Sequence, residues 1–410
     1  MNILVLNPGS STLKFGLFDL SDSNIGSDAK VLASGRVASI GSEYSALKIS
    51  GATQIGPLSE TIEAKTAAQA TEHIIRRLLA SGYKNDKETA TATIEAVGFR
   101  VVHGGARYIE PTHVTTSVLN YLRALGDLAP LHIPADVAAL EQVRLLLPNV
   151  PLIAVFDTAF HRTLPPVAHT YALPKEVCDR YGLRRYGFHG ISHAYVSARL
   201  IEHLGSGILG TKVITCHLGN GASICAVRDG QSIDISMGFT PLEGLVMGTR
   251  SGDVDAGLVL YLIRAAGMTP DAVDKLLNHK SGLLGVSNLS PDVRDLEQAA
   301  RDGNKSAELA LEVFAYRASK YIAAFAAVLE GLDAIAFTGG IGEHSASMRL
   351  RICRRLRFFG LNIEDELNEA ATGNADTRIS SDGNPIQIWV IPTDEERQIA
   401  LSTFKQLRDS

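Results

Sequence analysis

Short apolar runs and longer amphipathic stretches alternate along this chain. Apolar runs at 96–102, 152–156 and 386–391 predict buried strands. Apolar positions recur at helical spacing over four longer stretches, which are 67–79, 134–147, 194–204 and 305–329. Strands that alternate with helices predict an α/β fold.

Two predicted β-hairpins with similar turns stand far apart in the chain. The first joins strands 3–6 and 13–18 through the turn NPGSS, and the second joins 213–216 and 224–227 through HLGNGAS. Each turn contains an asparagine, a glycine and a serine, and each begins a region of similar size. This weak internal repeat predicts a duplicated fold with its site between the halves.

The stretch TGGIGEHS, residues 338–345, follows another apolar run and holds three glycines. Backbone amides at such a turn can approach an anion because no Cβ stands in the way, which favours a phosphate or nucleotide contact. A tight strand-to-helix turn without a ligand would suit the same glycines. The stretch alone therefore leaves both interpretations open.

Length and charge narrow the class of protein. A chain of 410 residues is too long for one ordinary core and predicts two domains, or three. The net charge of −5 argues against a nucleic-acid partner, which would require clustered Lys and Arg. The arginine-rich segment 349–357 is the exception, and its helical spacing predicts a solvated helix face.

Cysteine usage and the N-terminal segment indicate the cellular compartment of the protein. The cysteines show no metal-ligand spacing and no disulfide framework, and they are Cys178, Cys216, Cys225 and Cys353. The chain starts with the strand-like MNILVLN, and no apolar run reaches the ~18 residues of a membrane span. We expect a cytoplasmic protein without a membrane partner.

Charged side chains gather where predicted strands end. Arg100 lies inside the apolar strand 96–102, and Asp157 directly follows strand 152–156. Sites of α/β proteins form at the carboxyl ends of strands. A second arginine, Arg250, stands among small residues in GTRSGD. A structural ion pair is the alternative explanation for Arg100, since a buried arginine needs a partner.

Histidines add to this set. His132, His189 and His217 stand in the segments PLHIPA, YGFHGISH and HLGNG. His189 and His193 have the spacing of a zinc pair, but no acid matches them, so hydrogen bonds to phosphate oxygens are favoured. Core positions are expected for His103, His113 and His161. Arginines, histidines, an aspartate and glycine-rich turns, without a serine triad or a P-loop, suit phosphoryl transfer.

A series of longer motifs decides between these readings. In chain order they are NPGSSTLKF, HGG, PLHIPA, AVFDTAFH, YGFHGISH, HLGNGAS, MGFTPLEGLVMGTRSGD, PDVRDLE, FTGGIGEHS and PTDEE. Together they resemble the acetate kinase family over essentially the whole chain. The resemblance implies an α/β fold of the duplicated ribonuclease-H-like type (actin/Hsp70/sugar-kinase superfamily), with two domains and an interdomain cleft.

The resemblance also implies an activity and its partners. Family members transfer the γ-phosphate of ATP to acetate and use Mg²⁺, for which Mn²⁺ can substitute, and a homodimer is implied. The expected N-terminal domain, 1–155 with 392–410, handles magnesium, phosphate and acetate. The expected C-terminal domain, 156–391, binds the nucleotide and forms the dimer. Both are expected to close over the ligands.

Roles for individual residues follow from matched positions. The implied catalytic residues are Asp157, Arg100, Arg250 and His189, and the implied metal ligands are Asn7 and Glu395. The implied acetate pocket consists of Arg100, Val102, Leu131, Phe188 and Pro241. The implied phosphate and transition-state contacts are Ser10, Thr12, His132, His189 and Arg250. The implied nucleotide site consists of Lys14, His217, Leu218, Gly219, Asn220, Gly221, Asp292, Val293, Arg294, Gly339, Gly340, Ile341 and Gly342.

Three positions depart from the family pattern. Thr12 stands where serine is commoner, and Ile133 stands where asparagine is usual. Segment 281–295 is less glycine-rich than expected, and it borders the implied nucleotide site. This departure bears on the nucleotide preference and not on the phosphoryl chemistry.

Rival activities differ in what they require. A sugar kinase needs a base for the hydroxyl proton, whereas acetate is already ionised at neutral pH, so we expect Asp157 to position Arg100 or the metal shell. An ATPase of the actin or Hsp70 kind needs no pair of arginines for a small carboxylate. Propionate is the close competitor, because one methylene is worth only ~1–3 kcal/mol. The GGIGE glycines leave room for adenosine and favour ATP over pyrophosphate.

Overall fold

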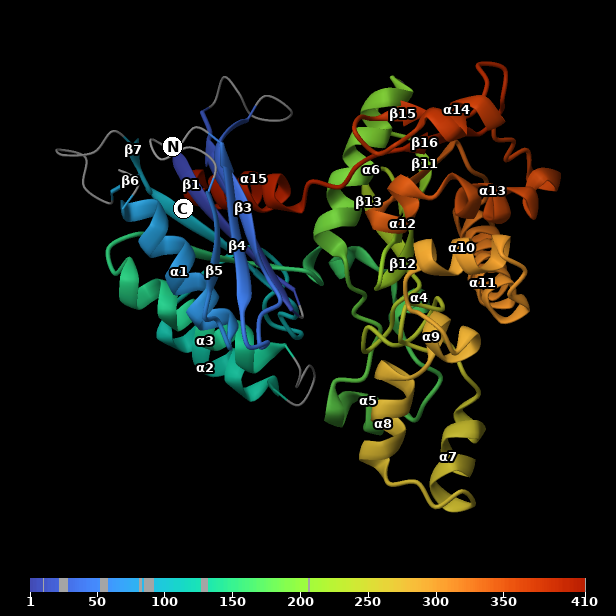
Figure 1. The fold of residues 1–410 in the computed structure, drawn as a ribbon, viewed down its shortest axis with the longest axis horizontal. Coiled ribbons are helices and arrows are strands. Elements are labelled where there is room, and N and C mark those ends of the chain that lie inside the picture. Colours follow the sequence, from blue (N-terminus) through green and yellow to red (C-terminus); the bar gives the residue numbers. More distant parts are fainter. Residues whose placement is uncertain are drawn as a thin grey trace. The chain divides into compact units, whose positions relative to one another are not determined.

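The computed structural model describes residues 1–9, 11–21, 29–51, 58–80, 83–84, 92–126, 132–205 and 207–409. The chain forms two compact units (Figure 1). Unit 1 is Met1–Ala159 with Asp394–Ser410, and unit 2 is Phe160–Thr393. In the described part of the chain, every helix is too short or too polar to cross a membrane.

Unit 1 is built on an eight-stranded sheet in the order β5-β4-β3-β2-β1-β8-β10-β9. These strands are β1 (Asn2–Pro8), β2 (Thr12–Asp19), β3 (Lys30–Ala38), β4 (Ser45–Gly51), β5 (Leu58–Ile62), β8 (Ala96–Val101), β9 (Thr112–His113) and β10 (Leu152–Phe156). A separate pair is formed by β6 (Tyr83–Lys84) and β7 (Ala92–Thr93). The helices are α1 (Ala67–Ala80), α2 (Thr116–Ala124), α3 (Ile133–Leu146) and α15 (Glu395–Arg408).

The C-terminal helix α15 covers one face of this sheet, and α1 to α3 lie on the other (Figure 1). A Cβ at Gly98 of β8 would come within 2.3 Å of Thr403 and 2.9 Å of Ile399, both in α15. Glycine at this position therefore lets the helix approach the strand closely. Side chains alternate along a strand, so Arg100 emerges on the same face as Gly98, toward α15.

Unit 2 is built on a six-stranded sheet in the order β13-β12-β11-β14-β16-β15. These strands are β11 (Lys212–Leu218), β12 (Ala222–Arg228), β13 (Gln231–Ile235), β14 (Ala334–Thr338), β15 (Thr377–Arg378) and β16 (Gln387–Val390). The helices are α4 (Pro166–His169), α5 (Lys175–Tyr181), α6 (Gly190–Leu204), α7 (Ala256–Arg264), α8 (Pro270–His279), α9 (Gly282–Ser287), α10 (Val293–Arg301), α11 (Lys305–Leu329), α12 (Gly339–His344), α13 (Ala346–Arg354) and α14 (Asp365–Ala370). Short 3₁₀ turns cover Ala159–Thr163 and Arg357–Phe359.

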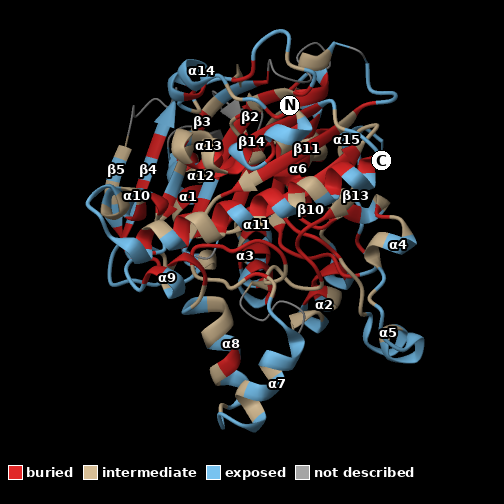
Figure 2. Ribbon diagram, turned by 90° about the vertical axis from the view of Figure 1, so that its right-hand side faces the viewer, coloured by how far each residue is buried: buried red, intermediate tan, exposed pale blue. Residues whose placement is uncertain are grey.

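The two sheets repeat one pattern, which confirms the duplicated α/β fold expected from the sequence. In unit 1, β3, β2 and β1 run antiparallel in turn, β1, β8 and β10 are parallel, and β9 adds an antiparallel edge. In unit 2, β13, β12 and β11 are antiparallel, β11, β14 and β16 are parallel, and β15 adds the edge. Strands and the long helix α11 are buried in the core, whereas α5, α7 and α8 are largely exposed (Figure 2).

The prediction of a solvated arginine face at 349–357 is wrong at its first residue. Arg349 is completely buried. Its guanidinium donates to the carbonyl oxygens of Gly342 and Glu343 at 2.9 Å and to those of Asn368 and Ala371 at 2.7 and 3.0 Å. These carbonyls belong to the ends of α12 and α14, which leave acceptors unsatisfied and attract a cation. Burial lowers the pKa of Arg349 to about 10.

Candidate functional site

In unit 1, Arg100 is held by two fixed acceptors. Its Nη1 donates to the Pro8 carbonyl at 2.8 Å, and its Nη2 donates to Asp157 Oδ2 at 3.0 Å. Burial opposes the charge of Arg100, but the carboxylates of Asp157, Glu395 and Asp136 raise its pKa above the ordinary value. Its Nε is buried and has no hydrogen-bond partner within the described residues. Arg100 is therefore a fixed cation whose buried Nε still lacks an acceptor among the described residues.

Asp136, which sequence reasoning missed, stands close to this pair. It lies in the first turn of α3, is 5% exposed, and accepts a hydrogen bond from the Val102 amide at 3.1 Å. Burial raises its pKa to about 7, against the lowering effects of that hydrogen bond and of Arg100. Val102 is a predicted wall of the acetate pocket, so Asp136 fixes the backbone of a predicted site residue. The sequence does carry a signal for Asp136. It is an acid four positions after His132, at the start of an apolar helix.

We expect Asp136→Asn to stabilise the protein more at high pH than at low pH. The unfolded chain releases this proton near pH 3.8, whereas the folded protein keeps it up to about 7. The folded state thus binds the extra proton in this window, and the contribution of Asp136 to the free energy of unfolding falls as the pH rises through it. Asparagine carries no charge and still offers an oxygen to Val102.

Urea unfolding of both proteins measures this effect. The stability of the variant relative to wild type should increase from about pH 4 to about pH 7 by a few kcal/mol and then level off. A difference that does not change with pH would show that the Asp136 carboxyl titrates normally.

Hard oxygen ligands gather where β1 meets the start of α15. The Asn7 amide donates to Glu395 Oε2 and to Glu396 Oε1, both at 2.8 Å. Burial raises the pKa of Glu396. The Lys14 cation opposes this rise, and the Glu395 carboxylate adds to it. Two carboxylates and an amide oxygen fit Mg²⁺, which is commonly held by one or two carboxylates together with substrate phosphates. Glu396 is a second acid that the predicted metal set, Asn7 and Glu395, did not include.

The remaining predicted residues of unit 1 come from β2, from the start of α3 and from segments outside the described residues. Thr12 and Lys14 are on β2, and Lys14 pairs with Asn7 across the hairpin. The Gly9 amide donates to the Thr12 carbonyl at 2.7 Å and closes the turn. His132 precedes α3 as its N-cap residue. Ser10 and Leu131 lie outside the described residues.

In unit 2, the turn between β11 and β12 brings His189 and Arg250 together. A Cβ at Gly221 would lie 3.3 Å from His189 Nε2 and 3.6 Å from Arg250 Nη1. The His189 and His217 rings stack with centroids 4.3 Å apart. His189 has a left-handed backbone with φ of 58° at the N-cap of α6, a conformation that is costly for a residue with a Cβ. Such strain points to a function. The helix α6, which follows His189, begins four residues before the predicted helix 194–204.

Arg250 differs from Arg100 in having no counter-charge among the residues that the structure describes. Its Nη1 donates weakly to the Pro241 carbonyl at 3.4 Å, and within the described residues no carboxylate lies within ion-pair distance. Burial lowers the pKa of Arg250. A guanidinium remains charged even then, because its ordinary pKa is above 12. A mostly buried cation that has no carboxylate beside it among the described residues is suited to bind an anion.

Hydroxyl groups fix the imidazoles around this turn. Ser223 Oγ contacts His189 Nδ1 at 2.9 Å and His193 Nε2 at 2.7 Å. His193 Nδ1 contacts Thr215 Oγ1 at 2.7 Å, and burial lowers the pKa of His193 well below its ordinary value. His161 and His103 are buried, as expected for core histidines, whereas His113 is half-buried on β9. Phe188, a predicted pocket residue, is 2% exposed and contributes its carbonyl to His161 Nε2 at 3.1 Å.

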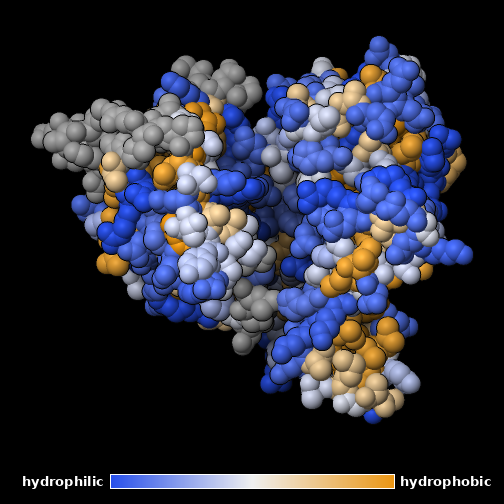
Figure 3. Space-filling model, in the orientation of Figure 1, coloured by the Kyte–Doolittle hydropathy of each residue, from blue (hydrophilic) through white to orange (hydrophobic). Residues whose placement is uncertain are grey.

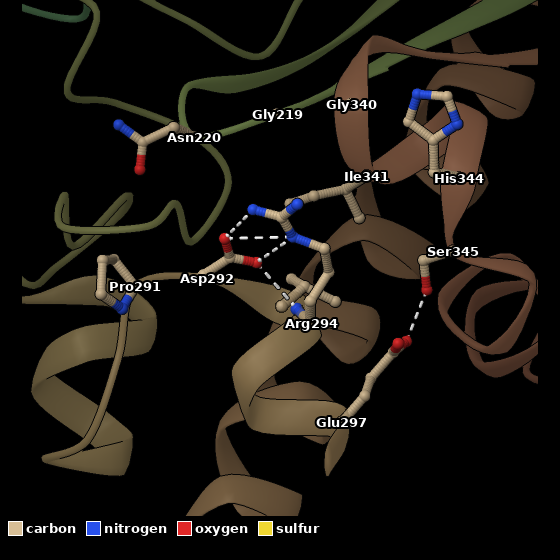
Figure 4. Close-up of a pocket in the computed structure, with 11 residues that line it drawn as sticks. Gly219, Asn220, Pro291, Asp292, Arg294, Glu297, Gly340, Ile341, His344 and Ser345 are labelled. Carbon is tan, nitrogen blue, oxygen red and sulfur yellow. Dashed lines mark hydrogen bonds and ion pairs between the residues drawn. The ribbon is translucent and has the colours of Figure 1, made fainter. Parts of the chain in front are cut away.

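A cavity of about 510 Å³ lies beside this turn in unit 2 (Figure 4). That volume is in the range of small-molecule sites. Predicted nucleotide residues that line it are Gly219, Asn220, Asp292, Val293, Arg294, Gly340 and Ile341. Sequence reasoning missed Pro291, Glu297, His344 and Ser345, which also line it. Arg294 is turned onto Asp292, with Nη2 2.5 Å from Oδ2, and Ser345 donates to Glu297 at 2.5 Å (Figure 4).

The three glycines of TGGIGEHS serve two different needs. Gly339 has a φ of 75°, and a Cβ there would lie 2.8 Å from the Leu218 carbonyl oxygen, so packing against β11 requires it. Its amide donates to Glu343 Oε1 at 2.8 Å and is not directed at a ligand. A Cβ at Gly342 would contact the Phe337 backbone at 3.3 Å. A Cβ at Gly340 would meet nothing within 4 Å, so the bare backbone faces the cavity only there.

Comparison with known proteins identifies the family of this chain. Residues 2–401 match the sequence model of the Acetokinase family. The chain belongs to that family. Among its acetokinase relatives, the acetate kinase of Phocaeicola vulgatus is 48% identical over 98% of this chain and 99% of its own length. The acetate kinase of Dictyoglomus thermophilum is 45% identical over 99% of each chain.

Solved acetokinase-family structures agree in fold. The crystal structure of Porphyromonas gingivalis acetate kinase has a TM-score of 0.86 and 39% identity, and 99% of each chain is covered. A propionate kinase from Francisella tularensis has a TM-score of 0.87 and 36% identity, with 98% of this chain and 99% of the other covered. Both likenesses extend over both units.

The structure brings the predicted acetokinase residues together in two separate sets. In unit 1 these are Asn7, Thr12, Lys14, Arg100, Val102, His132, Asp157 and Glu395, and in unit 2 they are Phe188, His189, His217 to Gly221, Pro241, Arg250, Asp292 to Arg294 and Gly339 to Gly342. Lys14, predicted with the nucleotide, thus belongs to a different unit from the cavity. The roles of all these residues stay predictions.

Proposed function

We propose that this chain transfers the γ-phosphate of ATP to acetate, giving acetyl phosphate and ADP, and that it also runs the reverse reaction. Its membership of the acetokinase family supports this activity, and the similar proteins from Phocaeicola vulgatus and Dictyoglomus thermophilum are named acetate kinases. One observation carries the proposal for the site. The Arg250 guanidinium is mostly buried, lacks a carboxylate partner among the described residues, and lies beside His189 and the Gly221 turn. That arrangement calls for an anionic group such as a transferring phosphoryl group.

The chemistry needs no base. Acetate is ionised at neutral pH, and one of its oxygens attacks the γ-phosphorus while the bond from phosphorus to the bridging oxygen of ADP breaks. ADP leaves with the electron pair of that bond, and no proton moves. In this proposal Arg100 holds the acetate carboxylate, Asp157 orients Arg100, and Arg250 with His189 stabilises the charge on the phosphoryl oxygens.

Magnesium is part of the proposal. Asn7 and Glu395 would hold the ion, with Glu396 beside them, and Mg²⁺, or Mn²⁺ in its place, would neutralise phosphate charge. Acetyl phosphate is an activated acyl group, so we further propose that the enzyme serves acetyl-CoA formation in the cytoplasm.

Trapping the product as a hydroxamate tests the activity. Acetate with ATP and Mg²⁺ should give acyl phosphate that reacts with hydroxylamine, and omission of acetate should abolish the signal. ATP loss without trapped product would instead favour an ATPase of the actin or Hsp70 kind. Ranking acetate, propionate and butyrate by kcat/KM separates acetate kinase from propionate kinase activity, and a preference for propionate would overturn the choice of acetate.

We also propose that the protein is a homodimer, and that α7 lies in its interface. The helix has the apolar sequence AGLVLYLIR, yet none of its residues is buried. Leu258, Leu260 and Tyr261 are 46%, 47% and 61% exposed. Figure 3 shows apolar residues gathered over α7. A helix that is apolar on all sides is normally covered, and a second copy of the chain is the proposed cover.

Charged substitutions on α7 should therefore produce monomers. We expect Leu258→Asp with Tyr261→Asp to shift the mass in solution from dimer to monomer, as measured by light scattering after gel filtration. Leu145→Asp is the control, because Leu145 is 73% exposed and belongs to unit 1, whereas α7 belongs to unit 2. An unchanged dimer in the α7 variant would exclude α7 from the interface.

A further inference from the structure

A single carboxylate oxygen organises the glycine turn of unit 2. Glu343 lies in α12, and its side chain is 13% exposed. Its Oε1 accepts from the Gly339 amide at 2.8 Å, from Thr338 Oγ1 at 3.2 Å and from the Thr393 amide at 3.1 Å. Hydrogen bonds to a charged acceptor are stronger than neutral ones, so this oxygen ties the start of α12 firmly to Thr393.

Thr393 continues the network toward the stacked imidazoles. Its Oγ1 lies 2.8 Å from Ser192 Oγ, which in turn lies 2.8 Å from His217 Nδ1. His217 stacks on His189, whose Nε2, like Nη1 of Arg250, lies close to Gly221. Four elements far apart in sequence are thereby joined: α12, the segment after β16, α6 and β11.

Among the described residues, the Glu343 charge has only a long ion-pair contact. His344 Nε2 lies 4.0 Å from Oε2, the carboxylate oxygen that does not accept from the three donors. A mostly buried carboxylate near a site for phosphates costs desolvation and repels the ligand. The three donors that converge on Oε1 account for its presence, because they fix both the turn that precedes the cavity residue Gly340 and the segment that contacts Ser192.

We propose that Glu343 is a positioning residue for phosphoryl transfer. Its carboxylate holds the Gly339–Gly340 turn against the nucleotide and, through Thr393 and Ser192, holds the imidazole of His217 against the phosphates. The inference rests on the proposed function and adds to it a residue that touches neither substrate.

Two substitutions of Glu343 separate positioning from charge. Glu343→Ala removes the acceptor, and we expect kcat to fall by about 10–100-fold and KM for ATP to rise, with KM for acetate unchanged, as for other residues that orient ligand-binding groups. Glu343→Gln keeps an oxygen for the three donors, so its kcat should stay within about threefold of wild type. Glu366→Ala, on exposed α14, is the control for loss of a glutamate and should match wild type.

A double-mutant cycle tests the connection to His217. Ser192→Ala breaks the network between Thr393 and His217 and should lower kcat without a large change in melting temperature. If Glu343 acts through Ser192, Glu343→Ala with Ser192→Ala should be barely slower than Glu343→Ala alone. Independent, multiplying effects would overturn the connection, and a Glu343→Ala protein with lowered melting temperature but wild-type kcat would overturn the positioning role.

A binding measurement keeps this inference separate from the proposed function. The affinity for ADP, measured by calorimetry, needs no acetate and no turnover. A wild-type protein that binds ADP but forms no acyl phosphate would contradict the proposed function alone. Equal ADP affinity in wild type and Glu343→Ala would contradict the inference alone, because the Gly339–Gly340 turn would then not depend on Glu343.

Discussion

Replacing Arg250 with alanine lowers kcat for acetyl phosphate formation by about 10³-fold, the cost of losing a guanidinium that stabilises phosphoryl transfer. Among the described residues no carboxylate is paired with Arg250, so the substitution breaks no ion pair of the fold. The loss of rate therefore reports the lost interaction with the substrate. Arg250→Lys should recover only part of the rate, because an ammonium group cannot reproduce the forked donors of a guanidinium. Steady-state kinetics with the hydroxamate assay measures both variants.

A matched arginine separates this effect from general loss of positive charge. Arg301 is exposed on α10 in the same unit, its Nη2 donates to Gln298 Oε1 at 2.8 Å, and Arg301→Ala should keep wild-type kcat. An Arg250→Ala enzyme within tenfold of wild type would remove Arg250 from the mechanism, since one transition-state donor is ordinarily worth about 10²-fold or more.

Asp157→Asn lowers kcat by about 10²-fold, and the rate does not recover as the pH is raised. Asparagine can still accept from Arg100 Nη2 but no longer balances its charge, and the buried guanidinium then shifts toward the remaining carboxylates, Asp136 and Glu395. Acetate binding suffers because Arg100 loses its fixed orientation.

The pH profile between about pH 6 and pH 9 distinguishes positioning from base catalysis. A general base would leave a variant that hydroxide partly rescues, so recovery at high pH would contradict the positioning role of Asp157. Titration with Mg²⁺ adds a second reading, because recovery at high magnesium would place the defect in the metal shell instead of in Arg100. Asp179→Asn on exposed α5 serves as the control and should behave as wild type.

The long periodic elements could be predicted from the sequence, because each carries its own signal. The pattern over 305–329 matches α11, and the patterns over 67–79 and 134–147 match α1 and α3 to within one residue at either end. The two predicted hairpins match β1 with β2 and β11 with β12, the first two strands of each large sheet, and thus predicted the duplication. The order of parallel strands was not contained in these local patterns, since it depends on pairs such as β1 with β8 that are far apart in sequence.

Residues of the candidate site could be predicted only where they lie in a recognisable sequence motif. Arg100, Asp157 and Arg250 interrupt apolar or small-residue runs, which makes them visible. Asp136 and Arg349 were missed or misread because charge in a helix is normally solvated, and only tertiary contacts reveal that both are buried. The glycines at 339 and 340 look equivalent in sequence, but one packs against β11 and the other faces the cavity.

The placement of α15 has a consequence for biosynthesis. This helix supplies Glu395 and packs against β1, β8 and β10, strands that leave the ribosome hundreds of residues earlier. Until α15 has been translated, Gly98 and its neighbours expose an apolar sheet face with no covering layer. Residues 1–159 therefore stay partly folded and prone to aggregate until α15 has been synthesised, while unit 2 already holds all of its own strands by then.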